Sequence, residues 1–212
     1  MRPFWTPMSA MHDRQYAESA QRNAQPILEI LRHEFQGSSD VLEIGSGTGQ
    51  HAVRFACELG HLQWQTSDLD ENHASIRAWV ADAGLPNVRA PISLDVTTAE
   101  VSSSYSAVYS ANTAHIMSFD AVVRMFALAA KVLHPGGVFC LYGPFRRFGE
   151  FNTESNAQFD ASLRSRDPAM GIRDLEELDK LGANHGLRRM SLYAVPSNNL
   201  VAVWKKTISG EQ

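Results

Sequence analysis

The feature that most constrains this chain of 212 residues is a short apolar segment that runs directly into a glycine-rich turn. Residues 41–49 read VLEIGSGTG, so glycine recurs at the alternate positions Gly45, Gly47 and Gly49. Glycine tolerates positive φ and lets the backbone approach a bound molecule, because it has no Cβ. Residues 50–59 follow with a helical pattern, and free N–H groups at a helix start favour a polar or anionic ligand. The segment therefore predicts a strand, a turn and a helix that hold a nucleotide-like molecule.

Two cofactor classes use such a turn. The dinucleotide pattern is G-x-G-x-x-G, with an acidic residue about 20 positions later. Here the third glycine comes one residue early, and Gln50 stands where that pattern has glycine. With Glu43 two residues before the first glycine, the segment resembles the first motif of class I S-adenosylmethionine-dependent methyltransferases. An NAD(P)-dependent oxidoreductase, supported by the glycine turn and Asp68, is the alternative.

Later segments follow in the order of the same resemblance. Residues 62–67 predict a second strand that ends at Asp68, where the methyltransferase pattern has a carboxylate on the ribose hydroxyls. A carboxylate suits a vicinal diol because it accepts two hydrogen bonds. Residues 91–96 predict a third strand, and Asp95 matches the position that meets the adenine amino group. A fourth strand at 105–110 and the sequence LHPGG before a fifth strand complete the pattern.

The resemblance implies S-adenosylmethionine as the cofactor. Arg22 has the charge and fork geometry for the methionine carboxylate, and the Asn112 amide offers donors and acceptors to cofactor or substrate. We expect Glu43 to face the glycine turn or the cofactor's amino group. Asp70 competes with Asp68 but can cap the helix that follows. The expected cofactor-binding residues are Arg22, Glu43, Gly45, Ser46, Gly47, Gly49, Asp68, Leu69, Asp95, Val96 and Asn112.

Strands and helices alternate over residues 40–143, which predicts right-handed parallel crossovers and a doubly wound sheet. Near the C-terminus, strands at 187–195 and 200–205 are separated by four residues, a connection that joins only antiparallel neighbours. The expected fold is α/β, a Rossmann-like doubly wound sheet of the class I methyltransferase type, mostly parallel with a C-terminal antiparallel hairpin. Residues 1–212 have the length of one domain of this kind.

Two segments lie outside this frame. An N-terminal arm at 1–22 precedes a helical pattern for which Asn23 is a plausible cap. An insertion at 144–173 follows the fifth strand, at the edge where such sheets bind ligands, and it predicts a lid. Four phenylalanines in it suggest a partly aromatic or apolar acceptor, or a small core of the lid itself: Phe145, Phe148, Phe151 and Phe159.

These segments carry a closer resemblance. Arg22-Asn23, Tyr142-Gly143-Pro144-Phe145, Glu154-Ser155-Asn156 and Arg166-Asp167-Pro168 are not general methyltransferase features. Together with residues 110–118 and 196–199 they closely resemble the methyltransferase-like protein 26 family, from about residue 16 to 206. Ala114 departs from it, since a larger apolar residue is expected there. The resemblance implies the cofactor and says little about the acceptor, which we expect to be a small molecule.

The chemistry of a sulfonium methyl group asks the protein mainly to align a nucleophile and exclude water. A general base is needed when the acceptor must lose a proton. His115, just past the fourth strand, is the best candidate for that base, although a hydrogen-bonded structural role is the competing interpretation. Tyr142, at the end of the fifth strand, either reaches the acceptor with its hydroxyl or packs beneath the lid.

Composition argues against several other functions. A formal net charge of -4 disfavours nucleic-acid binding, which needs clustered Lys and Arg. No run of 18 apolar residues predicts a membrane span, and residues 1–7 do not resemble a secretory signal. We expect Cys57 and Cys140 to be buried and reduced in a cytoplasmic protein, active as a monomer or homodimer.

Motif spacing excludes further chemistry. The eight histidines show no H-x-x-x-H spacing and the cysteines no C-x-x-C spacing, so no metal is expected. Ser46 lies inside the glycine turn rather than in a G-x-S-x-G elbow, and no G-K-[ST] closes the turn. A non-catalytic cofactor-binding or scaffold protein remains as a third hypothesis.

Overall fold

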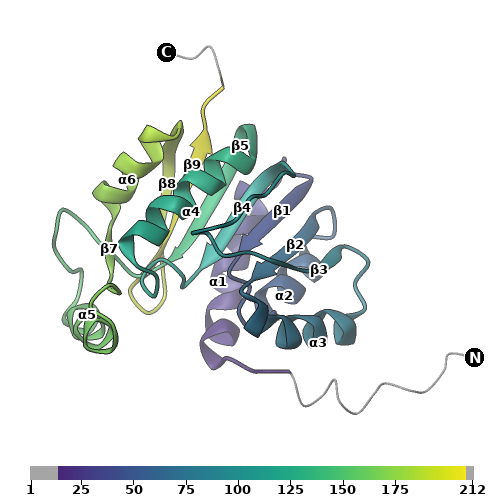
Figure 1. The fold of residues 1–212 in the computed structure, drawn as a ribbon, viewed down its shortest axis with the longest axis horizontal. Coiled ribbons are helices and arrows are strands. Elements are labelled where there is room, and N and C mark those ends of the chain that lie inside the picture. The colour runs from purple at the N-terminus through teal and green to yellow at the C-terminus, as the bar shows by residue number, and fades with distance from the viewer. Residues whose placement is uncertain (1–13, 209–212) are drawn as a thin grey trace, which may run out of the picture.

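The computed structural model describes residues 14–208, in which a seven-stranded sheet forms the centre of the molecule (Figure 1). Strands β1 to β5 pair in parallel, β9 is antiparallel to β5, and β8 is antiparallel to β9. This confirms the predicted fold class. In spatial order the strands are β3 (Val88–Ser93), β2 (Gln63–Asp68), β1 (Asp40–Ile44), β4 (Tyr105–Ala111), β5 (Leu133–Gly143), β9 (Asn199–Lys206) and β8 (Leu187–Val195).

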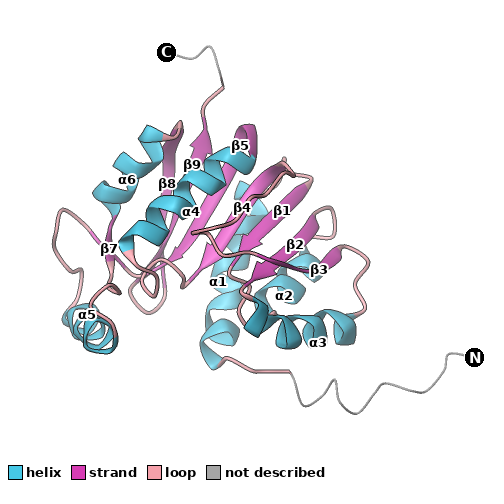
Figure 2. Ribbon diagram, in the orientation of Figure 1, coloured by secondary structure: helices cyan, strands magenta, loops and turns pink. Residues whose placement is uncertain are grey.

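Helices cover both faces of this sheet (Figure 2). On one face, α1 (Glu18–Glu34) and α2 (Gln50–Glu58) bury a cluster with β1, β2 and β4, and α3 (His73–Ala83) packs beside α2. On the other face, α4 (Phe119–Val132) and α6 (Leu175–Asn184) bury a second cluster. Two apolar layers on a sheet leave its ends open, so ligands are expected at the carboxyl edge of the strands.

Aromatic side chains anchor the cluster below the glycine turn. Phe55 of α2, Trp64 of β2 and Tyr109 of β4 are fully buried, and their ring centroids lie 5.6 to 5.9 Å apart. Each such pair contributes about 0.5 to 1.5 kcal/mol beyond its buried area. The glycine turn therefore lies next to a tightly packed aromatic cluster.

The first helix differs from the sequence prediction. It begins at Glu18, so Asn23 lies inside α1 and is not its cap. The backbone N–H of Ala17, just before the helix, donates to Gln50 Oε1 at 2.6 Å, and His51 Nε2 lies 3.1 Å from the Ala20 carbonyl oxygen. These contacts with α2 extend the helix toward the N-terminus. The side chain of Asn23 is thereby free for tertiary contacts.

Two smaller predictions about helix and strand ends are wrong. Asp70 opens a 3-10 turn, Asp70–Asn72, and α3 begins after it without a side-chain cap. Strand β3 ends at Ser93, so Asp95 lies in the loop beyond it. Cys57 is exposed and Cys140 is buried, so burial was right for one of the two cysteines. Of the arm predicted at residues 1–22, residues 1–13, including the segment judged not to be a signal, fall outside the described residues, and Glu18 to Arg22 belong to α1.

The insertion at 144–173 contains β6 (Phe145–Arg146), α5 (Glu154–Arg166) and the start of β7 (Arg173–Asp174). It packs on the loop that follows β4. Arg173 Nε donates to the Ala114 carbonyl oxygen at 2.9 Å, and Gly171 N–H donates to the His115 carbonyl oxygen at 3.0 Å. The insertion is thus tied to the end of a central strand rather than standing apart.

The insertion also holds the hairpin between β8 and β9. The amide groups of Asn152 and Asn156 both donate to the Asn198 carbonyl oxygen at 3.2 Å. Ser197 and Asn198 adopt positive φ of 64° and 59° in this turn. Fixing a carbonyl oxygen at the tip of the turn positions the neighbouring Ser197 and Asn199.

Within residues 14–208, no helix has the length and apolar character that crossing a membrane requires.

Candidate functional site

Glycines shape the turn between β1 and α2. Gly45, Gly47 and Gly49 have φ of 76°, 57° and 95°, which side chains rarely adopt. A Cβ on Gly45 would lie 2.6 Å from Thr113 Cγ2, so glycine is required there for packing as well. A Cβ on Gly47 would meet no chain atom within 4 Å, and Gly47 lines a cavity that its side chain would enter.

Asp68, at the end of β2, is buried and closes the turn from the side. Its Oδ2 accepts the Gly47 N–H at 2.7 Å. Its Oδ1 accepts the Leu69 N–H at 2.7 Å and the Asn72 amide at 2.8 Å. A carboxylate offers about four acceptor positions, so one on Oδ2 remains for a ligand hydroxyl.

Asp95 lies in the loop after β3 and is exposed. Its Oδ1 accepts hydrogen bonds from the backbone N–H and the hydroxyl of Thr97, at 2.8 and 2.7 Å. Both bonds lower the pKa of the Asp95 carboxyl, and the bond from the Thr97 hydroxyl has the larger effect. The side chain orders its own loop and still borders the cavity with its neighbour Val96.

A cavity of about 500 Å³ runs along the carboxyl edge from the loop after β3 to the loop after β4, and we call it the large cavity. Its polar boundary includes the glycine turn, Asp68 and Asp95. Leu69 and Ile116 are 44% and 49% exposed, an unusual state for large apolar side chains that both line it. An apolar lining with a few placed polar groups is typical of a small-molecule or cofactor site. The remaining apolar lining comes from Ile44, Leu94, Val96, Ala111, Met117 and Ala121.

Glu43 does not line the large cavity. It is buried in β1, where its Oε2 accepts hydrogen bonds from Ser46 Oγ at 2.9 Å and Trp64 Nε1 at 3.0 Å. Burial raises its pKa to about 7, against these two hydrogen bonds. Of the two expected orientations, the structure has the one toward the glycine turn, through Ser46. Ser46 in turn accepts the Ser67 N–H, so both side chains brace the turn from below.

Asn112 lies where two cavities meet. It follows β4, has a φ of 58°, and its N–H donates to the Tyr142 carbonyl oxygen at 2.9 Å. Positive φ in a residue other than glycine costs free energy and is often found at binding sites. Asn112 lines the large cavity on one side and a second, smaller cavity on the other.

The second cavity, of about 120 Å³, lies between α1, the ends of β4 and β5, and the β8–β9 hairpin, and we call it the polar pocket. Within residues 14–208, one charged side chain, that of Arg22, lines it. Its hydrogen-bonding residues include Arg22, Asn23, Asn112, Tyr142, Ser197 and Asn199.

His51 fixes the orientation of Asn23 at this pocket. His51 Nε2 lies 2.7 Å from Asn23 Oδ1 and 3.1 Å from the Ala20 carbonyl oxygen. Because a carbonyl only accepts, Nε2 carries the proton, and Nδ1 accepts the Tyr109 hydroxyl at 3.4 Å. Burial lowers the pKa of His51 to about 4, so the ring is neutral. With Oδ1 of Asn23 engaged, its amide N–H groups are left for the pocket.

Tyr142 is buried at the end of β5 with its ring against the polar pocket. The Asn199 amide donates to its hydroxyl oxygen at 2.9 Å. Burial raises the pKa of Tyr142, while hydrogen bonds from Asn23 and Asn199 act in the opposite direction. The side chain is therefore a neutral phenol at physiological pH.

His115 lies outside both cavities. It is 7% exposed, and its ring packs edge-on against Phe159 of the insertion at a centroid distance of 5.4 Å. Burial and the nearby Arg173 and Arg166 lower its pKa to about 4. His115 does lie just after β4, as the sequence predicted for a candidate base, but its side chain is covered by the contact with Phe159 of α5.

Arg22 lines the polar pocket and not the large cavity. Its side chain is 70% exposed and pairs with Glu18 at 3.4 Å, a contact that contributes little in water. The guanidinium therefore stays available to an anion at the pocket mouth.

Sequence reasoning missed several residues of this site. Asn23 and Asn199 face Tyr142 from segments that are far apart in the chain. Their signals were the Arg22-Asn23 pair and the Pro-Ser-Asn-Asn turn, which the sequence showed as distinctive without giving a role. Among residues 14–208, no three His, Cys, Asp or Glu side chains gather as a metal site would.

The solved structures that are similar to this fold include methyltransferases. An O-methyltransferase family protein from Burkholderia thailandensis superposes with a TM-score of 0.79 at 14% identity, covering 92% of this chain and 59% of its own. The S-adenosylmethionine-dependent methyltransferase SibL, in its apo form, superposes with a TM-score of 0.76 at 20% identity, covering 89% of this chain and 56% of its own. Human N-acetylserotonin methyltransferase, in complex with S-adenosylmethionine, superposes with a TM-score of 0.74 at 11% identity, covering 90% of this chain and 53% of its own.

The fold is thus the Rossmann-like fold of the class I methyltransferases, and the present chain spans little more than half the length of these structural neighbours. The chain belongs to the family described as "Protein of unknown function (DUF938)", whose model matches residues 14–206.

Proposed function

We propose that this protein is an S-adenosylmethionine-dependent methyltransferase acting on a small molecule. The observation that carries the proposal is the composition of the large cavity. A glycine turn without Cβ atoms, the Asp68 carboxylate and the exposed Leu69 and Ile116 occur together along one sheet edge. These groups suit a nucleoside with a polar tail, and the structural neighbours that are methyltransferases support the same ligand class.

Each group has a distinct part in this proposal. Asp68 accepts a ribose hydroxyl on its free Oδ2 position, and Leu69 and Ile116 enclose the adenine ring. Asp95 and Val96 border the adenine end, while the backbone at Gly45 and Gly47 follows the sugar and the thioether. Glu43, Ser46 and Gly49 support the turn. Arg22 faces the methionine carboxylate at the mouth of the polar pocket, where a guanidinium forms a charge-assisted pair.

The bound cofactor supplies an electrophilic methyl group, so the chain's own residues bind, orient and exclude water. Asn112 separates the two cavities and is the residue next to the reacting centre. The resemblance to the methyltransferase-like protein 26 family, carried by Arg22-Asn23 and the Pro-Ser-Asn-Asn turn, supports the same cofactor.

Isothermal titration with S-adenosylmethionine, S-adenosylhomocysteine and NAD tests this proposal. We expect both adenosyl compounds to bind with micromolar affinity and NAD to bind at least about 100-fold more weakly, which corresponds to about 2.7 kcal/mol. Tighter binding of NAD would favour an oxidoreductase. Binding of S-adenosylmethionine without transfer of its labelled methyl group to any component of a cell extract would favour a scaffold.

A further inference from the structure

The polar pocket continues the line of the large cavity along the sheet edge. Asp95, Asp68 and Gly45 follow β3, β2 and β1, and Asn112 follows β4 and lines both cavities. If the proposed function holds and the adenine lies at the β3 end, the reactive methyl group lies at the Asn112 end. A molecule in the polar pocket then lies directly beside it.

The pocket presents hydrogen-bond donors. The hydroxyl oxygen of Tyr142 accepts the Asn199 amide at 2.9 Å, and the Asn23 side chain lies near it. Within residues 14–208 the Tyr142 O–H donates to no other group, so it is free to donate into the pocket. Asn23 cannot turn its oxygen to the pocket, since His51 engages it at 2.7 Å. A ligand here meets the donors of Tyr142, Asn23 and Arg22, so a group with several acceptor atoms fits the pocket.

None of the groups that line the pocket takes up a proton at neutral pH. Burial raises the pKa of Tyr142, so it stays a phenol. Amides, hydroxyls and the Arg22 guanidinium are not bases at this pH either. An alcohol or an ammonium group must lose a proton before attack, whereas a carboxylate is already ionised above about pH 4.

The volume of the polar pocket further narrows the class of molecule that fits it. A cavity of about 150 Å³ holds a benzene ring, and the polar pocket measures about 120 Å³. A substituted aromatic ring exceeds its enclosed part, and the apolar lining is limited to Pro26, Val195 and Pro196, which suits a short aliphatic chain. The insertion's phenylalanines do not supply an apolar wall for a ring, because none of Phe145, Phe148, Phe151 and Phe159 lines the pocket.

We propose that the polar pocket binds the methyl acceptor, and that the acceptor is a small aliphatic carboxylic acid that becomes a methyl ester. One carboxylate oxygen accepts hydrogen bonds from Tyr142 and Asn23, and the other attacks the methyl carbon. The new bond joins oxygen to carbon, the carbon–sulfur bond breaks, and its electron pair remains on sulfur. The products are a neutral ester and a neutral thioether, so no proton moves and no base is required.

The experiment uses the full chain, labelled S-adenosylmethionine and two panels of small molecules. One panel holds hydroxy-, keto- and dicarboxylic acids of up to about eight heavy atoms, and the other holds the matching amides and alcohols with phenol and catechol. Mild alkali releases volatile methanol from methyl esters but not from ethers or methylamines. We expect volatile label from the acids alone. Base-stable label from the second panel, or no label from any acid, would overturn the proposal.

Two substitutions test the pocket itself. Tyr142→Phe removes a hydrogen bond to the charged carboxylate, and Asn199→Ala removes the amide that orients the Tyr142 hydroxyl. We expect each substitution to lower kcat/KM for the acid about tenfold or more. The dissociation constant of S-adenosylhomocysteine should stay within about twofold of the parent value, since neither residue lines the large cavity. Tyr193→Phe is the matched control, because Tyr193 lies on β8 and bonds Glu34 away from the pocket.

The outcomes separate two failures. If wild-type protein does not bind S-adenosylhomocysteine, the proposed function fails. If it binds but Tyr142→Phe and Asn199→Ala weaken that binding tenfold, the methionine end of the cofactor fills the interior of the pocket and not only its mouth at Arg22, and the acceptor assignment fails alone. Asn199 lies at the start of a surface hairpin, so its variant remains informative if Tyr142→Phe does not fold.

Discussion

The two halves of the sheet's carboxyl edge are built in different ways. Along β3, β2, β1 and β4, most residues of the large cavity lie at the carboxyl end of a strand or in the segment that follows it. Along β5 and β9, the polar pocket is assembled from α1, the ends of β4 and β5 and a hairpin, which are far apart in the chain. The first half has backbone and carboxylate groups in a short motif, whereas the second has amide side chains held by tertiary contacts.

The supports of the two halves differ accordingly. The glycine turn is braced from below by buried side chains of β1 and β2, chiefly Glu43 and Trp64. The hairpin is held from outside by the insertion, through Asn152 and Asn156 on the Asn198 carbonyl oxygen. The halves can therefore be altered separately, with cofactor binding depending on the first and acceptor choice on the second.

The largest expected effect is that of Gly45→Val, which alters the glycine turn of the large cavity. The new side chain needs positive φ and would meet Thr113 Cγ2 at 2.6 Å. Strain and overpacking together should lower the free energy of unfolding by about 2 to 5 kcal/mol and abolish binding of S-adenosylhomocysteine. Urea denaturation and titration calorimetry measure the two effects. Gly37→Val, in a turn with no neighbour within 4 Å, should change stability little.

Glu43→Gln tests the support beneath the turn. The folded protein holds the Glu43 proton more tightly than the unfolded chain does, because burial raises the pKa from 4.5 to about 7. Protonated Glu43 therefore contributes its full stabilisation of the folded protein below about pH 4.5, and this contribution is lost as the pH rises to about 7 and above. Glutamine keeps an oxygen for Ser46 and Trp64 and does not titrate. Relative to the variant, wild type should lose about 2 to 4 kcal/mol across this window.

Urea denaturation of both proteins at pH 4.5, 6 and 8 measures that difference. His51 and His115 contribute with the opposite sign, because their pKa values are lowered to about 4 and their stabilisation is lost as the pH falls below about 6.5. Both proteins contain these histidines, so their contribution cancels in the comparison. A constant difference between the two proteins at all three pH values would contradict the assigned role of Glu43.

Asp68→Asn separates ligand binding from turn closure within the first half. Asparagine keeps one oxygen for Leu69 and Asn72, but its amide group faces the Gly47 N–H where an acceptor is needed. We expect the dissociation constant of S-adenosylhomocysteine to rise about 10- to 100-fold, as for loss of a charge-assisted bond. Calorimetry at several temperatures below the unfolding midpoint checks this. An unchanged affinity would remove Asp68 from the site.

The contrast between the halves explains which features the sequence could reveal. Gly45, Gly47, Asp68 and the strands that carry them were predictable, because motif spacing along a parallel sheet brings strand ends together. Asn23 was taken as a helix cap, since nothing local indicated that contacts with His51 and Gln50 extend α1 by another turn. His115 was predicted as a base from its place after β4, and only the packing of Phe159 reveals its burial. Side chains that depend on distant segments leave no local pattern.

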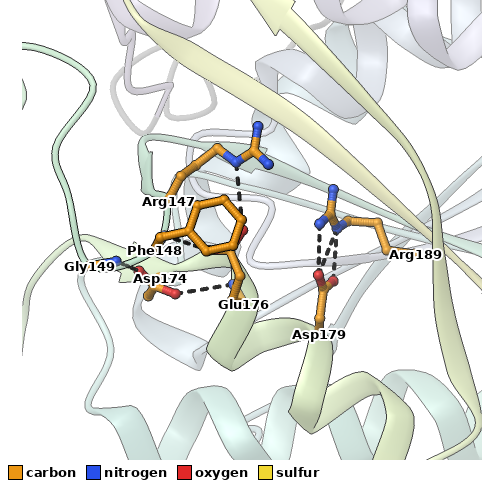
Figure 3. A network of polar contacts seen from close by, with 7 residues as sticks. All are labelled: Arg147, Phe148, Gly149, Asp174, Glu176, Asp179 and Arg189. Carbon is orange, nitrogen blue, oxygen red and sulfur yellow. Dashed lines mark hydrogen bonds and ion pairs between the residues drawn. The ribbon is translucent and has the colours of Figure 1, made fainter.

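The smallest effect concerns the insertion, which we expect to be independent of the first half. Phe148 is 75% exposed at the tip of a turn, with a φ of 52°, a conformation that aromatic residues avoid. Figure 3 shows that carboxylates hold its backbone: Glu176 accepts the Phe148 N–H at 2.8 Å and Asp174 accepts the Gly149 N–H at 2.6 Å. These bonds use main-chain donors and so survive substitution of the side chain.

Phe148→Asn should therefore relieve strain without loosening the turn, because asparagine tolerates positive φ. We expect the free energy of unfolding to rise by about 0.5 to 1 kcal/mol, less any loss of the contact between Arg147 and the ring, whose centroid lies 5.4 Å from the guanidinium carbon. Affinity for S-adenosylhomocysteine should be unchanged. A stabilised variant with normal cofactor binding but altered turnover would show that the insertion acts on the acceptor half, whereas weakened cofactor binding would show that the two halves are coupled.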